Sequence, residues 1–111
     1  DQVWFDGERI VLFDFDEFTL GDPMEDLAEF IVKLPADGSS AQLVAQWLSA
    51  YAQVAPQHFC HQRLRWHMAV QQVLQASRAF VFQVADWPAE VRRRLERAEL
   101  LAMQLNLESA A

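Results

Sequence analysis

Cysteine is almost absent from this chain of 111 residues, which contains Cys60 alone and therefore cannot form an internal disulfide. A lone cysteine is compatible with a reducing compartment, and we expect a cytoplasmic protein. Basic residues are also scarce, because 9 Lys and Arg stand against 16 Asp and Glu and leave a formal charge of −7. This balance disfavours a broad nucleic-acid surface and favours a cationic or metal-bridged partner.

Long apolar runs are missing as well. No segment reaches the ~18 uninterrupted apolar residues of a membrane-spanning helix, and the first residues lack the basic region and apolar core of a signal peptide, so we expect a soluble protein without membrane contacts. With three glycines in all, the chain has no glycine-rich nucleotide loop. Apolar residues are plentiful: they make up 52% of the chain and include eight Phe and four Trp. This composition excludes a disordered tail and indicates one domain at most, or a piece of a larger one.

The first 34 residues predict a β-hairpin followed by a capped helix. Two short apolar runs, Val3–Phe5 and 9–13, flank Asp6-Gly7, a dipeptide favoured in tight hairpin turns. Further on, Asp22 stands at the N-cap position, with Pro23 at the first helical position and Glu25 completing a capping box. The helix is predicted to run to about residue 34. Its buried stripe, at i, i+3, i+4, i+7 spacing, comprises Leu27, Phe30, Ile31 and Leu34.

Three further helices are predicted, over residues 40–54, 58–85 and 87–107, each bounded by proline, glycine or serine clusters. The fold class is therefore mainly α with a small N-terminal β-hairpin. We divide the chain into a hairpin over residues 1–16 and a helical subdomain over residues 22–111. Large aromatic residues on the helices are expected mainly in the core: Trp47, Tyr51, Trp66, Phe80 and Phe82.

The segment with most chemical content is Asp14-Phe15-Asp16, two carboxylates at the end of an apolar strand. Hard cations such as Mg²⁺ are held by one or two carboxylates and completed by substrate phosphates and water. One interpretation is a haloacid dehalogenase-like phosphatase, whose opening motif is Asp-x-Asp-x-Thr after a strand. Thr19 lies one residue too late for that motif, and the helices that follow do not predict a doubly wound sheet. An EF-hand is excluded because the loop lacks the required Gly and Glu positions.

A second interpretation uses the whole stretch from Ile10 to Ala28. Asp14-Phe15-Asp16 followed by Gly21-Asp22-Pro23 and Asp26-Leu27-Ala28 resembles the C-terminal lobe of the aminoglycoside phosphotransferase and choline kinase-like family, which has a protein kinase-like α+β fold. The departure within this stretch is Phe13, where the family usually has Ile. The resemblance covers residues 2 to about 34.

The resemblance implies roles for five residues. Asp14 would hold Mg²⁺ on the nucleotide phosphates, Asp16 would be an auxiliary ligand, and Gln2 would stand where the family has a metal-binding Asn. Asp22 and Asp26 would be structural, as a helix cap and as a brace for the catalytic loop.

The catalytic residue itself is not expected within this chain. The family's catalytic Asp would lie five residues before the position of Gln2, which places it upstream of Asp1. Asp1 is therefore not the catalytic carboxylate, and the chain alone should be inactive.

The implied parent enzyme transfers the γ-phosphoryl group of ATP, or of another nucleoside triphosphate, to a hydroxyl of a small molecule. The acidic balance is compatible with a cationic acceptor such as an amino sugar or a quaternary amine. A non-catalytic helical binding or regulatory module with a kinase-like lobe is the alternative, and Gln2 in place of Asn favours it.

Two other clusters of side chains could bind an ion. His58, Cys60, His61 and His67 suggest zinc, since His58 and His61 would be neighbours on a helix, but no Cys-x-x-Cys or second ligand pair supports that site. The run Arg92-Arg93-Arg94 with Arg97 could bind phosphate. Because it alternates with glutamates, we expect a solvated helix face instead.

Overall fold

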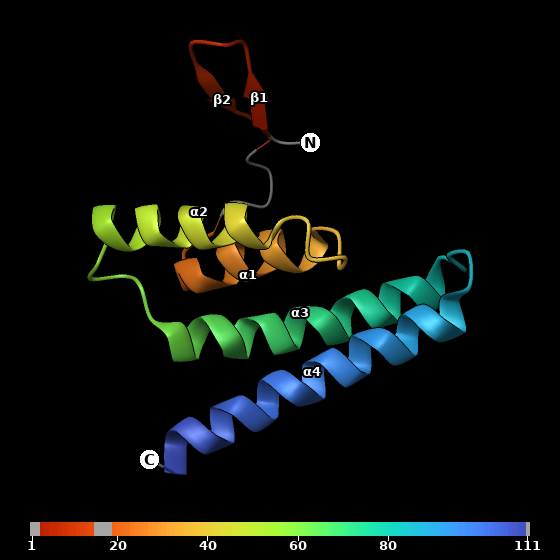
Figure 1. Ribbon diagram of the computed structural model, residues 1–111. Helices are drawn as coiled ribbons and strands as arrows, with labels where there is room; N and C mark the ends of the chain where they lie inside the picture. The colour runs from red at the N-terminus through yellow and green to blue at the C-terminus, as the bar shows by residue number, and fades with distance from the viewer. Residues whose placement is uncertain (1–2, 15–18, 111) are drawn as a thin grey trace.

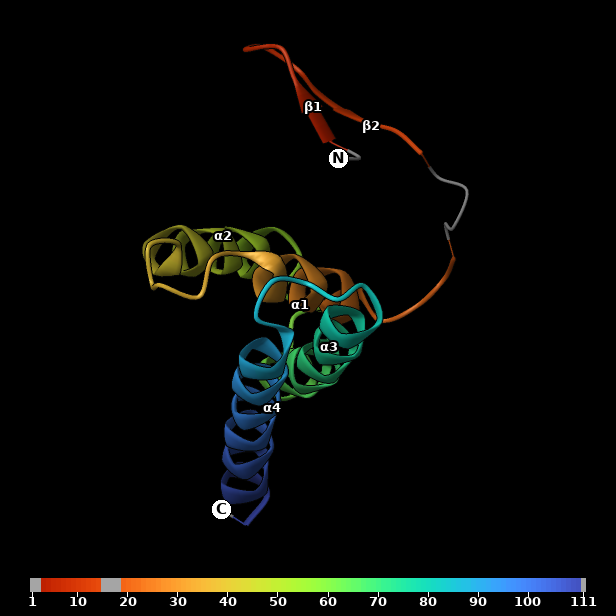
Figure 2. The same ribbon diagram turned by 90° about the vertical axis from the view of Figure 1, so that its right-hand side faces the viewer.

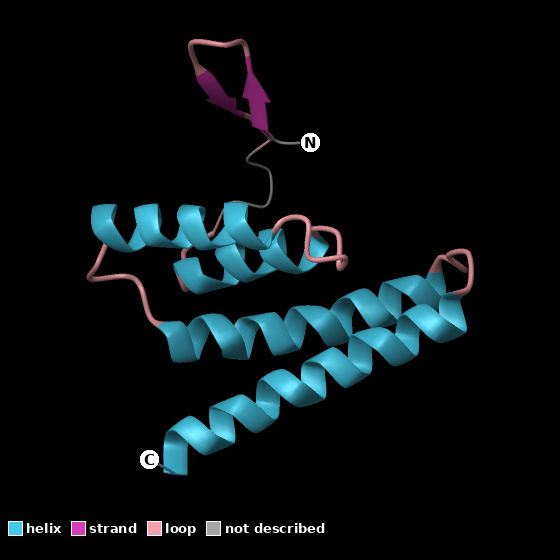
Figure 3. Cartoon of the chain, viewed as in Figure 1, coloured by secondary structure: helices cyan, strands magenta, loops and turns pink. Residues whose placement is uncertain are grey.

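The computed structural model describes residues 3–14 and 19–110, which form a two-stranded antiparallel sheet and four helices (Figures 1 and 3). The elements are β1 (Val3–Phe5), β2 (Ile10–Leu12), α1 (Pro23–Lys33), α2 (Ala41–Val54), α3 (His61–Val81) and α4 (Trp87–Ala110). A mainly helical chain with a small N-terminal hairpin is therefore confirmed. Within the described ranges, no helix is long and apolar enough to cross a membrane.

The hairpin pairs Val3 with Leu12 and Phe5 with Ile10. Its turn differs by one residue from the expected Asp6-Gly7, because the Asp6 N–H donates to the Arg9 carbonyl at 3.3 Å and leaves Gly7 and Glu8 at the tip. The Asp6 carboxylate accepts hydrogen bonds from the backbone N–H groups of Glu8 (3.1 Å) and Arg9 (2.8 Å). Gly7 has φ +93°, a conformation that glycine adopts without steric cost.

Both faces of the hairpin are exposed. Its apolar strand residues range from 38% exposure at Val11 to 70% at Ile10, and the sheet stands away from the helices in both views (Figures 1 and 2). A two-stranded hairpin with no face buried against another layer is marginally stable at best. The apolar side chains of β1 and β2 therefore form an exposed apolar surface.

The main core lies where α1 crosses α3. Met24, Leu27 and Ala28 of α1 are buried together with Leu64 of α3, and half-buried side chains of α2 and the α2–α3 connection surround them. The buried stripe predicted for α1 is wrong at Phe30, which is 50% exposed. The helix is rotated so that the small Ala28 and the flexible Met24 face α3. Phe30 turns towards α2 instead, and its ring centroid lies 4.8 Å from that of Trp47.

A second interface joins α3 and α4 as an antiparallel pair (Figure 1). Small or aliphatic residues on both helices are buried along it, namely Ala76, Ala79, Ala98 and Leu101. The helix predicted to reach residue 85 ends at Val81, because Gln83 takes a left-handed φ of 49° and the Val84 N–H donates back to the Ala79 carbonyl at 3.1 Å. This closure normally uses glycine, and so the sequence did not indicate it.

Several aromatic residues expected in the core are on the surface. Trp66, Phe80 and Phe82 are 55%, 54% and 74% exposed, whereas Trp47 and Tyr51 pack partly against the α1–α3 core. Phe80 and Phe82 lie at the C-terminal end of α3, where the ring of Phe80 meets that of Trp87 with centroids 5.0 Å apart. Trp66 lies in the first half of α3, with its ring edge to face with that of His67. The α1–α3 core therefore lies at the first half of α3, and the buried interface with α4 extends to its C-terminal half.

Candidate functional site

Asp14 lies two residues after the end of β2 and is the one predicted metal ligand within the described residues. Its φ is 64°, in the left-handed region that aspartate tolerates better than most non-glycine residues. The residue is exposed. The backbone therefore turns sharply out of the strand at a carboxylate that is open to a cation.

The other two predicted ligands, Gln2 and Asp16, lie outside the described residues, and so does Asp1, upstream of which the catalytic Asp is expected. Across residues 3–14 and 19–110, no three His, Cys, Asp or Glu side chains come together to hold a metal ion. A cage built entirely of described protein side chains is therefore not the arrangement around Asp14. A hard cation shared between one carboxylate, substrate phosphates and water needs no such cage, and the exposed oxygens of Asp14 suit it.

Asp22 joins the start of α1 to α3. Its Oδ1 accepts a hydrogen bond from the Met24 N–H at 3.0 Å, which is the helix cap predicted from the sequence. Its Oδ2 accepts one from Nε of Arg63 at 2.9 Å and lies 3.3 Å from Nε2 of His67. The Arg63 guanidinium also donates to the His58 carbonyl at 3.1 Å, so the same side chain holds the α2–α3 connection.

These contacts determine the protonation of Asp22. Burial acts to raise the pKa of its carboxyl, but hydrogen bonds from Met24 and His67 and the charge of Arg63 outweigh it and hold the pKa below the usual 3.8. The carboxylate is ionised at neutral pH, and its position at a helix N-terminus favours the negative charge as well. A carboxylate with both oxygens engaged is suited to architecture and not to proton transfer.

Asp26 occupies a different environment, in the first turn of α1. Its side chain is exposed and borders a cavity of about 350 Å³ that reaches from the hairpin to α2. Apolar side chains form the rest of its wall: Val3, Leu27, Phe30, Leu43, Val44 and Trp47. Among the described residues, the Asp26 carboxylate takes part in no hydrogen bond to another side chain or to the backbone. It is open to a donor or cation from elsewhere.

The structure does not form the helical His58–His61 pairing that suggested zinc. The helix α3 begins at His61, so His58 lies in the preceding turn and the expected helical pairing of the two imidazoles does not form. The ring of His61 instead meets that of Phe59 edge to face, with centroids 4.7 Å apart. His67 faces Asp22.

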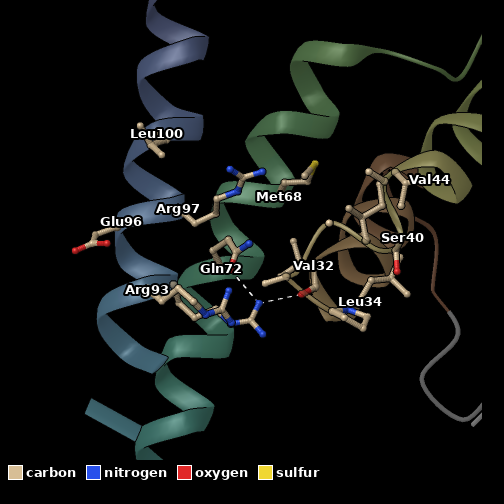
Figure 4. A pocket seen from close by; sticks show the side chains of 16 residues that line it. Val32, Leu34, Ser40, Val44, Met68, Gln72, Arg93, Glu96, Arg97 and Leu100 are labelled. Atoms are coloured by element: carbon tan, nitrogen blue, oxygen red, sulfur yellow. Dashed lines mark hydrogen bonds between the residues drawn. The ribbon is translucent and has the colours of Figure 1, made fainter. Parts of the chain in front are cut away.

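The arginine run on α4 is only partly the solvated face that the sequence predicts. Arg94 has a side chain only 14% exposed and donates to the Val32 carbonyl at 2.9 Å, to Oε1 of Gln72 at 3.0 Å and to Glu90 at 2.8 Å. It thereby connects α4 to the last turn of α1 and to the middle of α3 (Figure 4). The carbonyls of a last helical turn have no partner within their helix, and Arg94 supplies one.

The sequence did not indicate Arg63, His67 and Arg94 as structural partners. Arg63 and His67 are four residues apart on α3, as are Glu90 and Arg94 on α4, and this spacing places each pair on one helix face. That spacing predicts that the two members of each pair are neighbours on a helix. It does not predict their partners at Asp22 and Val32, which are distant in sequence.

Comparisons with protein families, with curated proteins and with solved structures find no match for this chain. The features that bear on function are the exposed Asp14 after β2, the capped start of α1 and the cavities between the helices.

Proposed function

We propose that this chain is the C-terminal lobe of an ATP-dependent small-molecule phosphotransferase with a protein kinase-like fold. The observation that carries the proposal is Asp14, an exposed carboxylate on a left-handed backbone at the end of β2, followed by a helix capped at Asp22. Backbone strain of this kind is concentrated at functional sites. The exposed apolar hairpin also favours a larger protein, since β1 and β2 would pack against its nucleotide-binding part.

In this proposal Asp14 would hold a magnesium ion, with Asp16 and Gln2 as further oxygen ligands. Bound magnesium would neutralise charge on the transferred phosphoryl group. Asp22 keeps α1 in place through Arg63 and His67, and Asp26 offers its open carboxylate to the catalytic loop. The catalytic Asp of that loop, upstream of Asp1, would accept the proton of the acceptor hydroxyl as its oxygen bonds to the γ-phosphorus and the bond to the β-phosphate oxygen breaks.

A charge-removing substitution at Asp14 tests the proposal in the protein that carries this chain with its nucleotide-binding lobe. Asp14→Asn keeps the size and the tolerance for left-handed φ while removing the charge. We expect ATP-dependent phosphorylation of the acceptor to fall on the order of a hundredfold or more, the effect of losing a charge-stabilising group. The matched control is Glu8→Gln, which removes an exposed charge from the same hairpin and should leave the rate unchanged.

Near-normal transfer by the Asp14→Asn protein would refute the metal role. Thermal melting by circular dichroism shows whether both variants remain folded. The chain of 111 residues by itself should bind Mg²⁺ and ATP weakly in a calorimetric titration, and tight stoichiometric binding would contradict the expected location of the nucleotide site.

The acceptor is proposed to be a small hydroxyl compound with a positive charge. The support is the formal charge of −7, because an acidic cleft attracts cations. A screen of amino sugars, amino alcohols and uncharged sugars with the full protein would identify it. Turnover restricted to uncharged sugars would exclude the cationic class.

A non-catalytic binding module is the second candidate. Gln2 in place of the family's Asn favours it, and so does the extent of exposed apolar surface on β1, β2 and α3. The residues that precede Asp1 in the full protein distinguish the two. An Asp five positions before Gln2 supports the enzyme, and its replacement supports the module.

A further inference from the structure

A groove of about 600 Å³ lies between α4 and the connection from α1 to α2 (Figure 4). This volume is in the range of small-molecule sites. Most of the surface is apolar and comes from four elements, with Val32 and Leu34 at the end of α1, Val44 on α2, Met68 on α3 and Leu100 on α4.

The charged side chains of the groove come from α4 and are predominantly basic. Arg93, Arg94 and Arg97 all line it. Glu90 engages the first two, with its oxygens accepting from Arg93 at 2.8 Å and from Arg94 at 2.8 Å. Burial acts to raise the pKa of Glu90, but the two arginines lower it below its usual 4.5, so this carboxylate is charged and offsets one guanidinium.

Arg97 is the guanidinium left for a ligand. Among the described residues it takes part in no hydrogen bond or ion pair, and Figure 4 shows it directed from α4 towards Met68, across the groove from Val44. Glu96 also lines the groove, but its carboxylate points away from the Arg97 guanidinium in the same view. The groove therefore has an excess of positive charge in a chain whose overall charge is −7.

We propose that this groove binds an amphiphilic carboxylate, a small molecule with one carboxylate on an apolar body. Arg97 would hold the carboxylate, since a guanidinium pairs with a carboxylate through two parallel hydrogen bonds. Val44, Met68 and Leu100 would contact the apolar body. A compact polyanion fits less well because Arg93 and Arg94 are already engaged and most of the groove surface is apolar.

This site is independent of the proposed phosphotransferase function. It contains none of Asp14, Asp22 and Asp26, and its lining comes from α1, α2, α3, α4 and the connection between α1 and α2. Loss of one function would leave the other in place.

The test is a calorimetric titration of the 111-residue chain with octanoate, with octan-1-ol, acetate and inorganic phosphate as comparison probes. We expect saturable octanoate binding that is stronger than binding of the other three. Arg97→Gln should weaken octanoate binding about tenfold, the effect of losing a charged hydrogen bond. The matched control is Arg92→Gln, which removes the same charge from an exposed position of α4 outside the groove and should leave binding unchanged.

A second variant, at an exposed position where the fold should be retained, tests the same site. Leu100 is 52% exposed, so Leu100→Asp should be tolerated, and its new carboxylate beside Arg97 should abolish octanoate binding. Absence of saturable octanoate binding would overturn the proposal. So would equal octanoate affinity for the wild type and for a folded Arg97→Gln or Leu100→Asp protein, or phosphate binding as tight as octanoate binding.

Discussion

Removal of the Asp22 side chain should weaken the packing of α1 on α3. Asp22→Ala eliminates the helix cap, which is worth about 1 kcal/mol. It also eliminates the pair with Arg63, whose side chain is 52% exposed and contributes about 0.5 kcal/mol, and the contact with His67, which is 15% exposed and contributes about 1 kcal/mol. Because such terms are not strictly additive, we expect the free energy of unfolding to fall by about 2 kcal/mol.

Asp22→Asn separates the cap from the charge. Asparagine caps helices about as well as aspartate, so this variant should lose only the electrostatic part, about 1 kcal/mol. The assay is urea denaturation followed by tryptophan fluorescence and circular dichroism, with Glu99→Ala, an exposed carboxylate on α4, as a control that should stay within about 0.5 kcal/mol of the wild type. Stability of Asp22→Ala within about 0.5 kcal/mol of the wild type, or equal losses for the Ala and Asn variants, would refute this account.

The stability difference between the wild type and Asp22→Asn should also depend on pH. The pKa of Asp22 is lower in the folded chain than its usual 3.8, so the unfolded chain binds more protons at this site and the stabilisation is complete above that value. It is lost as the pH falls through the folded pKa. The stability difference between wild type and Asp22→Asn should therefore be constant at higher pH and shrink below about pH 4. A difference that grows with acidity would contradict the sign.

Two further substitutions test the helical core by urea denaturation. Arg94→Met leaves the Val32 carbonyl without its partner and should lower the free energy of unfolding by about 2 kcal/mol. Arg92→Met, on the exposed side of α4, should lower it by less than about 0.5 kcal/mol. Equal losses for the two variants would show that the Arg94 contact is not stabilising. Met24 has no exposed surface, so Met24→Ala should lower the free energy of unfolding by about 2–5 kcal/mol. Met103 is 54% exposed, so Met103→Ala should lower it far less. Similar values for the two methionines would place the core elsewhere.

Local chemistry made part of the fold predictable. The hairpin follows from two apolar runs around Asp6 and Gly7, although the tip moved by one residue because the Asp6 carboxylate captured two backbone N–H groups. The start of α1 follows from Asp22 and Pro23, since a cap depends on residues within one turn. The end of α3 was less predictable because Gln83 occupies a left-handed position that glycine usually marks.

The orientation of each helix face was harder to predict. A periodic pattern shows that α1 has an apolar face, but Phe30 and Ala28 compete for it, and only the approach of α3 buries Ala28 and leaves Phe30 against Trp47. The candidate site shows the same division. Asp14 and Asp26 were identified from their motif, whereas the open position of both carboxylates depends on how the hairpin and α1 are placed.

The sequence by itself determined the order of the elements, the cap at Asp22 and the position of Asp14 at a strand end, because each depends on neighbours a few residues away. The tertiary structure alone decided that Asp22 meets Arg63 and His67, 41 and 45 residues further on, and that Arg94 reaches Val32, 62 residues before it. It also decided that Arg97, although exposed, borders an apolar groove. Contacts over such separations arise only when packing of the apolar faces brings the helices together, and no local pattern of residues specifies them.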